Sequence, residues 1–360
     1  MSETVENKQS SSDSYVCMRC GAALKYKPDT EFLHCEYCGT DTPIEVKKVD
    51  EVQELDFEQY AQNFEQLNTK ASKIIACRKC GAQSTFDENL KSVACPYCTT
   101  PLIESDVHEE RLIPPSYLLP FKIEGRDVQQ HLNTWIKKLW FAPNKLKHQV
   151  RYSHKLQGVY IPCWTYDAQT ETDYTGERGE DYMATVGSGK NQRTVTKTRW
   201  YSCNGHVSLF FDDVLVPASG MIPQNILNKI DRWDTNNLVE ADNRFLSGFI
   251  TEKYVMNLNN GYERAKQIMN TRIDSSIRRD IGGDRQKIGS KDTKYSEIKF
   301  KLILLPVYMS SYVYNNKLYH FFLNARMGQI TGDRPYSPFK IALTVILAIV
   351  AIILLFKWMS

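Results

Sequence analysis

The chain has 360 residues, of which 42% are hydrophobic and 24% charged, and its formal net charge is +3. This composition excludes an intrinsically disordered chain and is typical of a globular protein with a substantial core. The first residues, MSETVENKQSSSDS, are polar and rich in Ser. We therefore expect a disordered segment over residues 1–14 and no secretory signal there.

Eight of the ten cysteines stand in two frames of identical spacing, the second shifted by sixty residues. In each frame two C-x2-C pairs are separated by fourteen residues, and the second pair encloses Tyr37 in one frame and Tyr97 in the other. Four thiolates hold zinc tetrahedrally, and each C-x2-C turn presents two sulfurs to one ion. The frames predict tandem zinc ribbons over residues 15–45 and 73–106, with one zinc ion each. The predicted ligands are Cys17, Cys20, Cys35, Cys38, Cys77, Cys80, Cys95 and Cys98.

A disulfide framework and an iron–sulfur site are the alternatives for these cysteines. Disulfides are typical of secreted chains, and no secretory signal is expected here. An iron–sulfur site also takes four cysteines, but the spacing of paired knuckles favours zinc. Because four protein ligands leave no open position for water or substrate, we interpret both zinc ions as structural.

Residues 46–72, between the ribbons, are predicted to form a helical linker. Its apolar residues fall at helical spacing and are expected to pack against a ribbon. These residues are Phe57, Tyr60, Phe64, Leu67 and Ala71.

Residues 107–335 are predicted to form a larger, mostly antiparallel α+β domain next to the membrane. Helices are expected at residues 127–140 and 262–281, the second ending at Gly282-Gly283. Strands are expected at residues 158–166, 194–201, 207–216 and 299–314, with 317–323 as the return of a hairpin.

Residues 341–356 carry no charge and include twelve Ile, Leu, Val or Phe residues. The run spans about 24 Å, and flanking residues at the interface extend it toward the roughly 30 Å hydrocarbon layer. A buried core helix is the alternative, but a terminal helix that is apolar on every face has no natural partner. We predict a transmembrane tail anchor over residues 338–358. Three basic residues shortly before the span and one after it predict a cytoplasmic N-terminal part, where zinc thiols stay reduced.

Several segments outside the ribbons resemble a known family. They are LLPFKI, WFAPNK, GVYIPCWTYDAQTETDYTGERG and LLPVYMSSYVYNNKLYHFFLNARMGQITGDRP. With the ribbons and the anchor, they are similar to the YdjG-like bacterial tail-anchored zinc-ribbon membrane proteins, often labelled phage replisome organiser, primosomal or helicase-type. The resemblance covers most of residues 15–358. It implies the bacterial cell membrane, an SPFH-type protein as candidate partner, and no functional residues beyond the eight zinc cysteines.

The helicase label requires a P-loop, and we find none. The nearest segment, GSGKN at residues 187–191, lacks the first Gly and the Ser or Thr, so we interpret it as a polar hairpin tip. Residue types for two catalytic constellations are present: His206, Asp212, Asp213 and Ser219 for a triad, and Cys163, His154 and Asp167 for a thiol site. Neither has a supporting sequence frame. We predict no catalytic residue and no enzymatic activity.

The distribution of charge along the chain helps to choose between the remaining functional hypotheses. Residues 1–106 carry 11 basic and 18 acidic residues, a net charge of −7, whereas residues 107–360 carry 34 and 24, a net charge of +10. Nucleic-acid binding needs basic residues against phosphate, so the sign of the ribbons disfavours it. The basic segment 137–155 faces either solvent or anionic headgroups. We predict a membrane-anchored, cytosol-facing adaptor that recruits protein partners. The alternatives are a membrane-tethered nucleic-acid or replisome factor without its own motor, and an enzyme with an unrecognised site in residues 107–335.

Overall fold

The structure is a computed structural model that describes residues 15–46, 52–62, 69–85, 94–144, 156–189, 192–315 and 317–359. The segment 1–14, predicted to be disordered, lies outside these residues, as does most of the basic segment 137–155. The chain has the predicted α+β class. It combines a large, mostly antiparallel sheet with two clusters of four cysteines and one apolar helix near the C-terminus.

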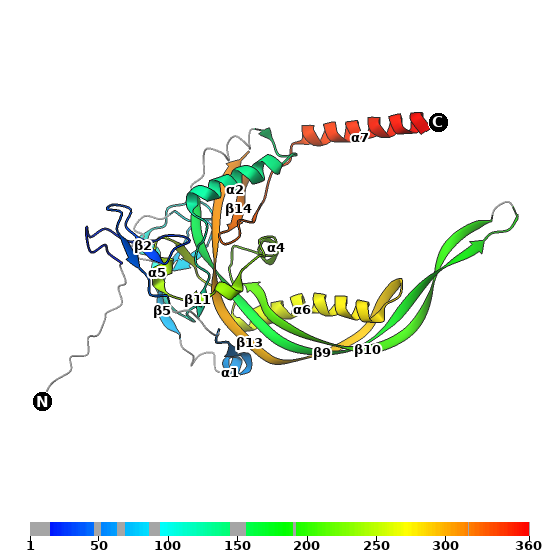
Figure 1. The fold of residues 1–360 in the computed structure, drawn as a ribbon, viewed down its shortest axis with the longest axis horizontal. Helices are drawn as coiled ribbons and strands as arrows, with labels where there is room; N and C mark the ends of the chain where they lie inside the picture. The colour runs from blue at the N-terminus through cyan, green and yellow to red at the C-terminus, as the bar shows by residue number, and fades with distance from the viewer. Residues whose placement is uncertain are drawn as a thin grey trace.

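Three long strands form the centre of the sheet: β9 (Gln157–Val186), β10 (Arg193–Pro217) and β13 (Arg285–Tyr314). β9 pairs antiparallel with both of the others. β13 begins opposite Gly179, so the β9–β10 hairpin continues alone beyond that residue. We call residues 180–189 and 192–199 the arm. Figure 1 shows the strands curving away from the body and the arm extending beyond α6. Residues 187–189 lie between the end of β9 and the start of β10, as predicted for a hairpin connection.

The predicted strands are correctly placed but too short. The two segments at 194–201 and 207–216 belong to one continuous strand, β10, and the segment at 158–166 is only the start of β9. The reason is that the distal strands carry exposed or half-exposed residues on both faces, so no apolar alternation marks them. The predicted hairpin return is confirmed as β14 (Lys317–Asn324).

Both predicted long helices are confirmed. α6 (Leu258–Ile281) lies along the concave side of the long strands (Figure 1) and ends at Gly282, whose φ of 66° suits glycine at a helix end. α2 (Gly125–Lys138) buries Val128, Leu132 and Ile136 on one face, at the helical spacing that predicted it.

Apart from α7, the remaining elements are short. The first ribbon forms its own sheet of β1 (Lys25–Tyr26), β2 (Phe32–His34) and β3 (Asp41–Pro43). The large sheet also contains β4 (Leu55–Asp56), β5 (Lys70–Ala76), β6 (Gln83–Thr85), β7 (Val107–Leu112), β8 (Tyr117–Leu118), β11 (Val239–Glu240), β12 (Ile250–Glu252) and β15 (Ile330–Gly332). The short helices are α1 (Phe57–Gln62), α4 (Gln224–Leu227) and α5 (Asn243–Leu246).

Phe57 and Tyr60 of the linker stripe pack against the body rather than against a ribbon, which corrects the prediction for these two residues. In α1, the ring of Phe57 lies 4.5 Å from that of Tyr262, and the ring of Tyr60 lies 5.2 Å from that of Phe300. These partners belong to α6 and β13, because β4 joins the edge of β13 and carries α1 with it. Ala71 lies in β5 rather than in a helix, and Phe64 and Leu67 lie outside the described residues.

α7 (Pro338–Met359) is long and apolar enough to cross a membrane, and none of its apolar window is buried against the body. Its 21-residue apolar stretch, Pro338–Trp358, is about 31 Å long, which matches the hydrocarbon layer of a bilayer. Figure 1 shows α7 leaving the body on the side opposite to β2 of the first ribbon.

Candidate metal centres

The first four-cysteine group, ribbon 1, is built from two tight turns. In the first, the Gly21 amide donates to the carbonyl of Cys17 (2.8 Å) with a φ of 74°, a conformation that glycine adopts without strain. The chain then returns through β1 and β2 to the second turn. The sulfur atoms of Cys17 and Cys38 lie 3.5 Å apart, as do those of Cys20 and Cys35.

The second group, ribbon 2, repeats this geometry. The Gly81 amide donates to the carbonyl of Cys77 (2.9 Å) at a φ of 76°. The sulfurs of Cys77 and Cys98 are 3.4 Å apart, and those of Cys80 and Cys95 are 3.5 Å apart. In each group, all four sulfurs lie within 4.8 Å of one another. The structure thus brings the eight cysteines together in the two predicted sets.

Both groups fit zinc. Four sulfurs at about 2.3 Å from one ion stand roughly 3.8 Å from each other in a tetrahedron, close to the separations found here. All ten cysteines are free, and the sulfurs are too far apart for disulfide bonds, which does not fit the disulfide alternative. A four-iron cluster would hold its cysteine sulfurs farther apart, since each binds a different iron atom, and a two-iron cluster would divide them into two separated pairs. Zinc bound to four thiolates would close each pair of turns into one folded unit.

In each group, a threonine two residues after the last cysteine lowers the pKa of that cysteine. A hydrogen bond with the Thr40 side chain lowers the pKa of the Cys38 thiol to about 6. Burial raises the pKa of Cys98, but hydrogen bonds with Thr100 outweigh that effect and bring it to about 7. A thiolate is the form that binds metal, so these contacts favour it at Cys38 and Cys98, whereas burial raises the pKa of Cys80 and Cys95.

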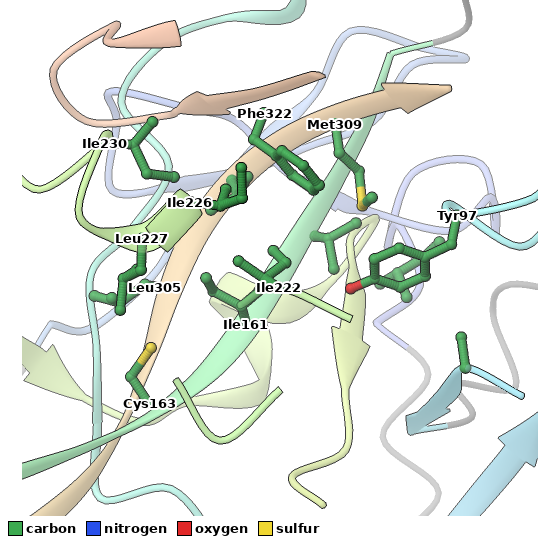
Figure 2. Close-up of a cluster of buried hydrophobic side chains, with 14 of the residues drawn as sticks. Tyr97, Ile161, Cys163, Ile222, Ile226, Leu227, Ile230, Leu305, Met309 and Phe322 are labelled. Atoms are coloured by element: carbon green, nitrogen blue, oxygen red, sulfur yellow. The ribbon is translucent and has the colours of Figure 1, made fainter. Parts of the chain in front are cut away.

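The surroundings of the two groups differ. Tyr97, in the second knuckle of ribbon 2, is only 2% exposed, and its hydroxyl donates to Glu252 (2.7 Å), which also accepts from Ser219 (2.8 Å). Figure 2 shows the Tyr97 hydroxyl directed into the cluster that contains Ile222 and Met309. Burial raises the pKa of Glu252. β6 of ribbon 2 also pairs with β12, so this ribbon is part of the large sheet.

Ribbon 1 instead docks on the body through one edge of its small sheet. The Ser247 hydroxyl donates to the carbonyl of Leu24 (2.7 Å), and the Tyr26 amide donates to the carbonyl of Ser247 (3.0 Å). The Tyr26 ring meets that of Phe245 edge-on at 5.0 Å. The opposite side, with both knuckles, faces solvent: Met18 is 97% and Tyr37 is 84% exposed.

A third group of potential ligands was not predicted from the sequence. Glu54, Asp167 and Asp213 lie close enough for one ion, but Lys301 already supplies the positive charge. Its ammonium is 2.6 Å from both Glu54 and Asp213, and the residue is 3% exposed. Burial, and then the hydrogen bond with Glu54, raise the pKa of Asp167 to about 7. We interpret this group as a structural charge cluster. It ties the linker between the ribbons to the central strands.

The four residues considered for a triad do not converge. His206 lies exposed between Glu171 (2.7 Å) and Asp173 (2.8 Å) on the long strands, whereas Ser219 bonds to the buried Glu252. The other members are placed apart from these: Asp213 faces Lys301, Asp212 is exposed, Cys163 is buried, and His154 lies outside the described residues.

Comparison with known proteins finds a relative of similar length. The chain is 25% identical over 330 residues to the uncharacterized protein YdjG of Bacillus subtilis strain 168, an alignment that covers 91% of this chain and 92% of YdjG. No protein-family model and no solved structure matches the chain. The similarity agrees with the YdjG-like resemblance. Two four-cysteine sites and an apolar helix near the C-terminus together fit a membrane-anchored zinc-binding protein.

Proposed function

We propose that the protein is a membrane-anchored, cytosol-facing adaptor whose ribbon 1 binds a protein partner. The observation that carries this proposal is the exposure of Met18 (97%) and Tyr37 (84%) in the two zinc knuckles of ribbon 1. Large apolar side chains held open on a rigid, metal-closed turn are typical of protein-binding surfaces. In ribbon 2 the tyrosine at the matching position is buried, so only ribbon 1 offers such a surface among the described residues.

The surface of ribbon 1 is acidic. Residues 15–46 contain three basic and five acidic residues, and zinc with four thiolates adds two further negative charges. We therefore expect the partner to present an apolar pocket with basic residues at its rim, because complementary charge speeds association and selects the partner. An SPFH-type protein, which the family resemblance implies, is the first candidate.

The location supports the same proposal. α7 is proposed to cross the membrane with the body on the cytoplasmic side, because Arg326, Arg334 and Lys340 precede the charge-free run of residues 341–356, whereas Lys357 follows it. Ribbon 1 then faces away from the membrane (Figure 1), toward soluble partners. Carbonate extraction of membranes should leave the full chain in the pellet and release a variant without residues 338–360. Release of the full chain would contradict the anchor.

The adaptor proposal is tested by purifying the full chain from mild detergent with its partners. Replacing Met18 and Tyr37 together by Ser should reduce recovery of the specific partner at least tenfold, while the zinc content stays at about two ions. The matched control is Tyr182→Ser, since Tyr182 is a 42% exposed aromatic residue on the arm. Equal recovery from both variants would show that ribbon 1 is not the binding surface.

The structure reduces the support for the alternative of a nucleic-acid-binding protein. Arg78, in the first knuckle of ribbon 2, pairs with Asp106 at 2.5 Å, which neutralises one of the two basic residues there. Salt-dependent binding of DNA or RNA that is lost on neutralising Arg78 and Lys79 would favour this alternative.

A further inference from the structure

Two adjoining cavities lie where α7 leaves the body. The larger has a volume of about 640 Å³ and lies between α2, β14, β15 and the segment that leads into α7. The smaller, of about 320 Å³, shares Lys317, Tyr319 and Tyr336 with it and extends to Pro338, the first residue of α7. The two cavities together form one hollow at the root of the membrane helix, which we call the root cavity.

The root cavity is lined by cations. Lys229, Lys317 and Arg334 contribute to its wall, against one carboxylate, Asp333, among the described lining residues. In the part of the chain that the structure describes, none of the three cations forms an ion pair with a carboxylate. Lys317 lies over the ring of Tyr319 (5.6 Å) and Arg334 over that of Tyr336 (5.3 Å), contacts that hold the charges in place without neutralising them.

Contacts around α7 place the root cavity at the level of the membrane surface. Lys340 donates to the carbonyl of Ala142 (2.8 Å) and to the Asn144 side chain (2.7 Å), which fixes the first turn of α7 beside the end of α2. At this level Trp140 is 71% and Phe339 is 76% exposed. Exposed aromatic residues beside a membrane helix mark the interface where headgroups lie.

The cavity also has an apolar wall. Trp135 of α2 and Leu139, which directly follows α2, line it together with the rings of Tyr319 and Tyr336. A free phosphate would satisfy the cations but would leave most of a volume of about 640 Å³ unfilled. A phosphate attached to a glycerol and acyl chains would satisfy both walls. Ligand sites that combine a few charged groups with aromatic walls suit such amphipathic molecules.

We propose that the root cavity binds the headgroup phosphate of one anionic phospholipid, with Lys229, Lys317 and Arg334 as its ligands. The proposal rests on the proposed membrane location of α7, because only there does the cavity meet lipid. Such a bound lipid would fix the angle at which the body stands over the membrane. It would also make that arrangement depend on lipid composition.

Lipid binding is measured on the full chain in neutral detergent, by native mass spectrometry with phosphatidylglycerol or phosphatidylcholine added. We expect one tightly held phosphatidylglycerol and no comparable phosphatidylcholine. The variant K229Q/K317Q/R334Q should bind phosphatidylglycerol at least tenfold more weakly. The matched control R193Q/K197Q/R199Q removes the same charge from the arm and should bind as the wild type does.

Several outcomes would overturn the proposal. Equal weakening in both triple variants would mean unspecific charge attraction. Competition by inorganic phosphate at concentrations comparable to the lipid would make the cavity a site for free phosphate. If the triple variant fails to fold, judged by its zinc content, the exposed Lys317→Gln change alone should still weaken binding about threefold or more, and an unchanged affinity would refute the site. Carbonate extraction reports on the anchor separately, so a failed anchor and a failed lipid site are distinguishable.

Discussion

Ribbon 1 and ribbon 2 share one ligand spacing and one turn geometry, yet the same tyrosine is 84% exposed in the first and 2% exposed in the second. The spacing of the cysteines determines the local fold, because zinc chemistry requires it. It does not determine the surroundings. Ribbon 2 is joined to the large sheet through β6 and β12, whereas ribbon 1 keeps a separate three-stranded sheet. A repeated metal site can therefore support the core in one copy and remain open for binding in the other.

The largest difference between the two ribbons is expected from two single variants, each of which lacks one zinc ligand in one ribbon. The wild type should hold about two zinc ions and each single variant about one. Because structural zinc contributes on the order of 10 kcal/mol to the folding of its module, Cys35→Ser should unfold ribbon 1 only. Cys95→Ser should also destabilise the body, since Tyr97 and β6 lose their support. Metal analysis and hydrogen exchange of the full chain measure both effects. Similar hydrogen exchange of the body in the two variants would show that ribbon 2 supports the core no more than ribbon 1 does.

The next largest difference in stability is expected from truncating the two tyrosines at matching positions, Tyr37 in ribbon 1 and Tyr97 in ribbon 2. Tyr97→Ala removes a buried ring and leaves Glu252 with fewer donors, so we expect a loss of about 3–5 kcal/mol in the free energy of unfolding. Tyr37→Ala removes an exposed ring and should cost no more than about 0.5 kcal/mol. Chemical unfolding of the full chain in detergent measures the pair. Losses of the same size would mean that both knuckles are buried to a similar extent.

The sequence predicted the features that depend on residues close together in the chain and missed those that depend on residues far apart. The zinc ligands, α2 and α6 are set by spacings within one segment, so local patterns predicted them. The burial of Tyr97 depends on Glu252, 155 residues away, and Lys301 meets Glu54 across 247 residues. No local pattern encodes such pairs. The length of β9 and β10 was also missed, because strands with polar side chains on both faces lack the alternation that marks a half-buried strand.

The docking of ribbon 1 can be weakened without touching its metal. Ser247→Ala removes the hydroxyl that donates to the carbonyl of Leu24 at 2.7 Å and leaves that buried acceptor without its donor. The expected loss is about 1 kcal/mol, confined to ribbon 1. Hydrogen exchange should therefore rise in β1 and β2 and stay unchanged in β5 and β6, with both zinc ions retained. A rise in both ribbons would show that they are mechanically coupled through the body.

The last expected effect concerns the charge cluster of Glu54, Asp167, Asp213 and Lys301, which connects the linker between the two ribbons to the central strands. The pKa of Asp167 is raised to about 7 in the folded protein, above its unfolded value of about 3.9. The folded state therefore binds more protons in this range, and the stability that this group contributes at low pH is lost as the pH rises toward 7. Asp167→Asn mimics the protonated form and does not titrate.

Between pH 6 and 8 the wild type should accordingly lose about 1.4 kcal/mol of unfolding free energy relative to Asp167→Asn. The lowered pKa of Glu54 acts in the opposite direction but at more acidic pH, outside this window. Unfolding of the full chain at pH 6, 7 and 8, with zinc retained, compares the two slopes. Parallel curves would mean that Asp167 is already ionised at pH 6 and that Lys301 alone balances the cluster. In that case an ion pair of constant charge would connect the linker to the central strands, and the stability of this connection would not vary with pH in this range.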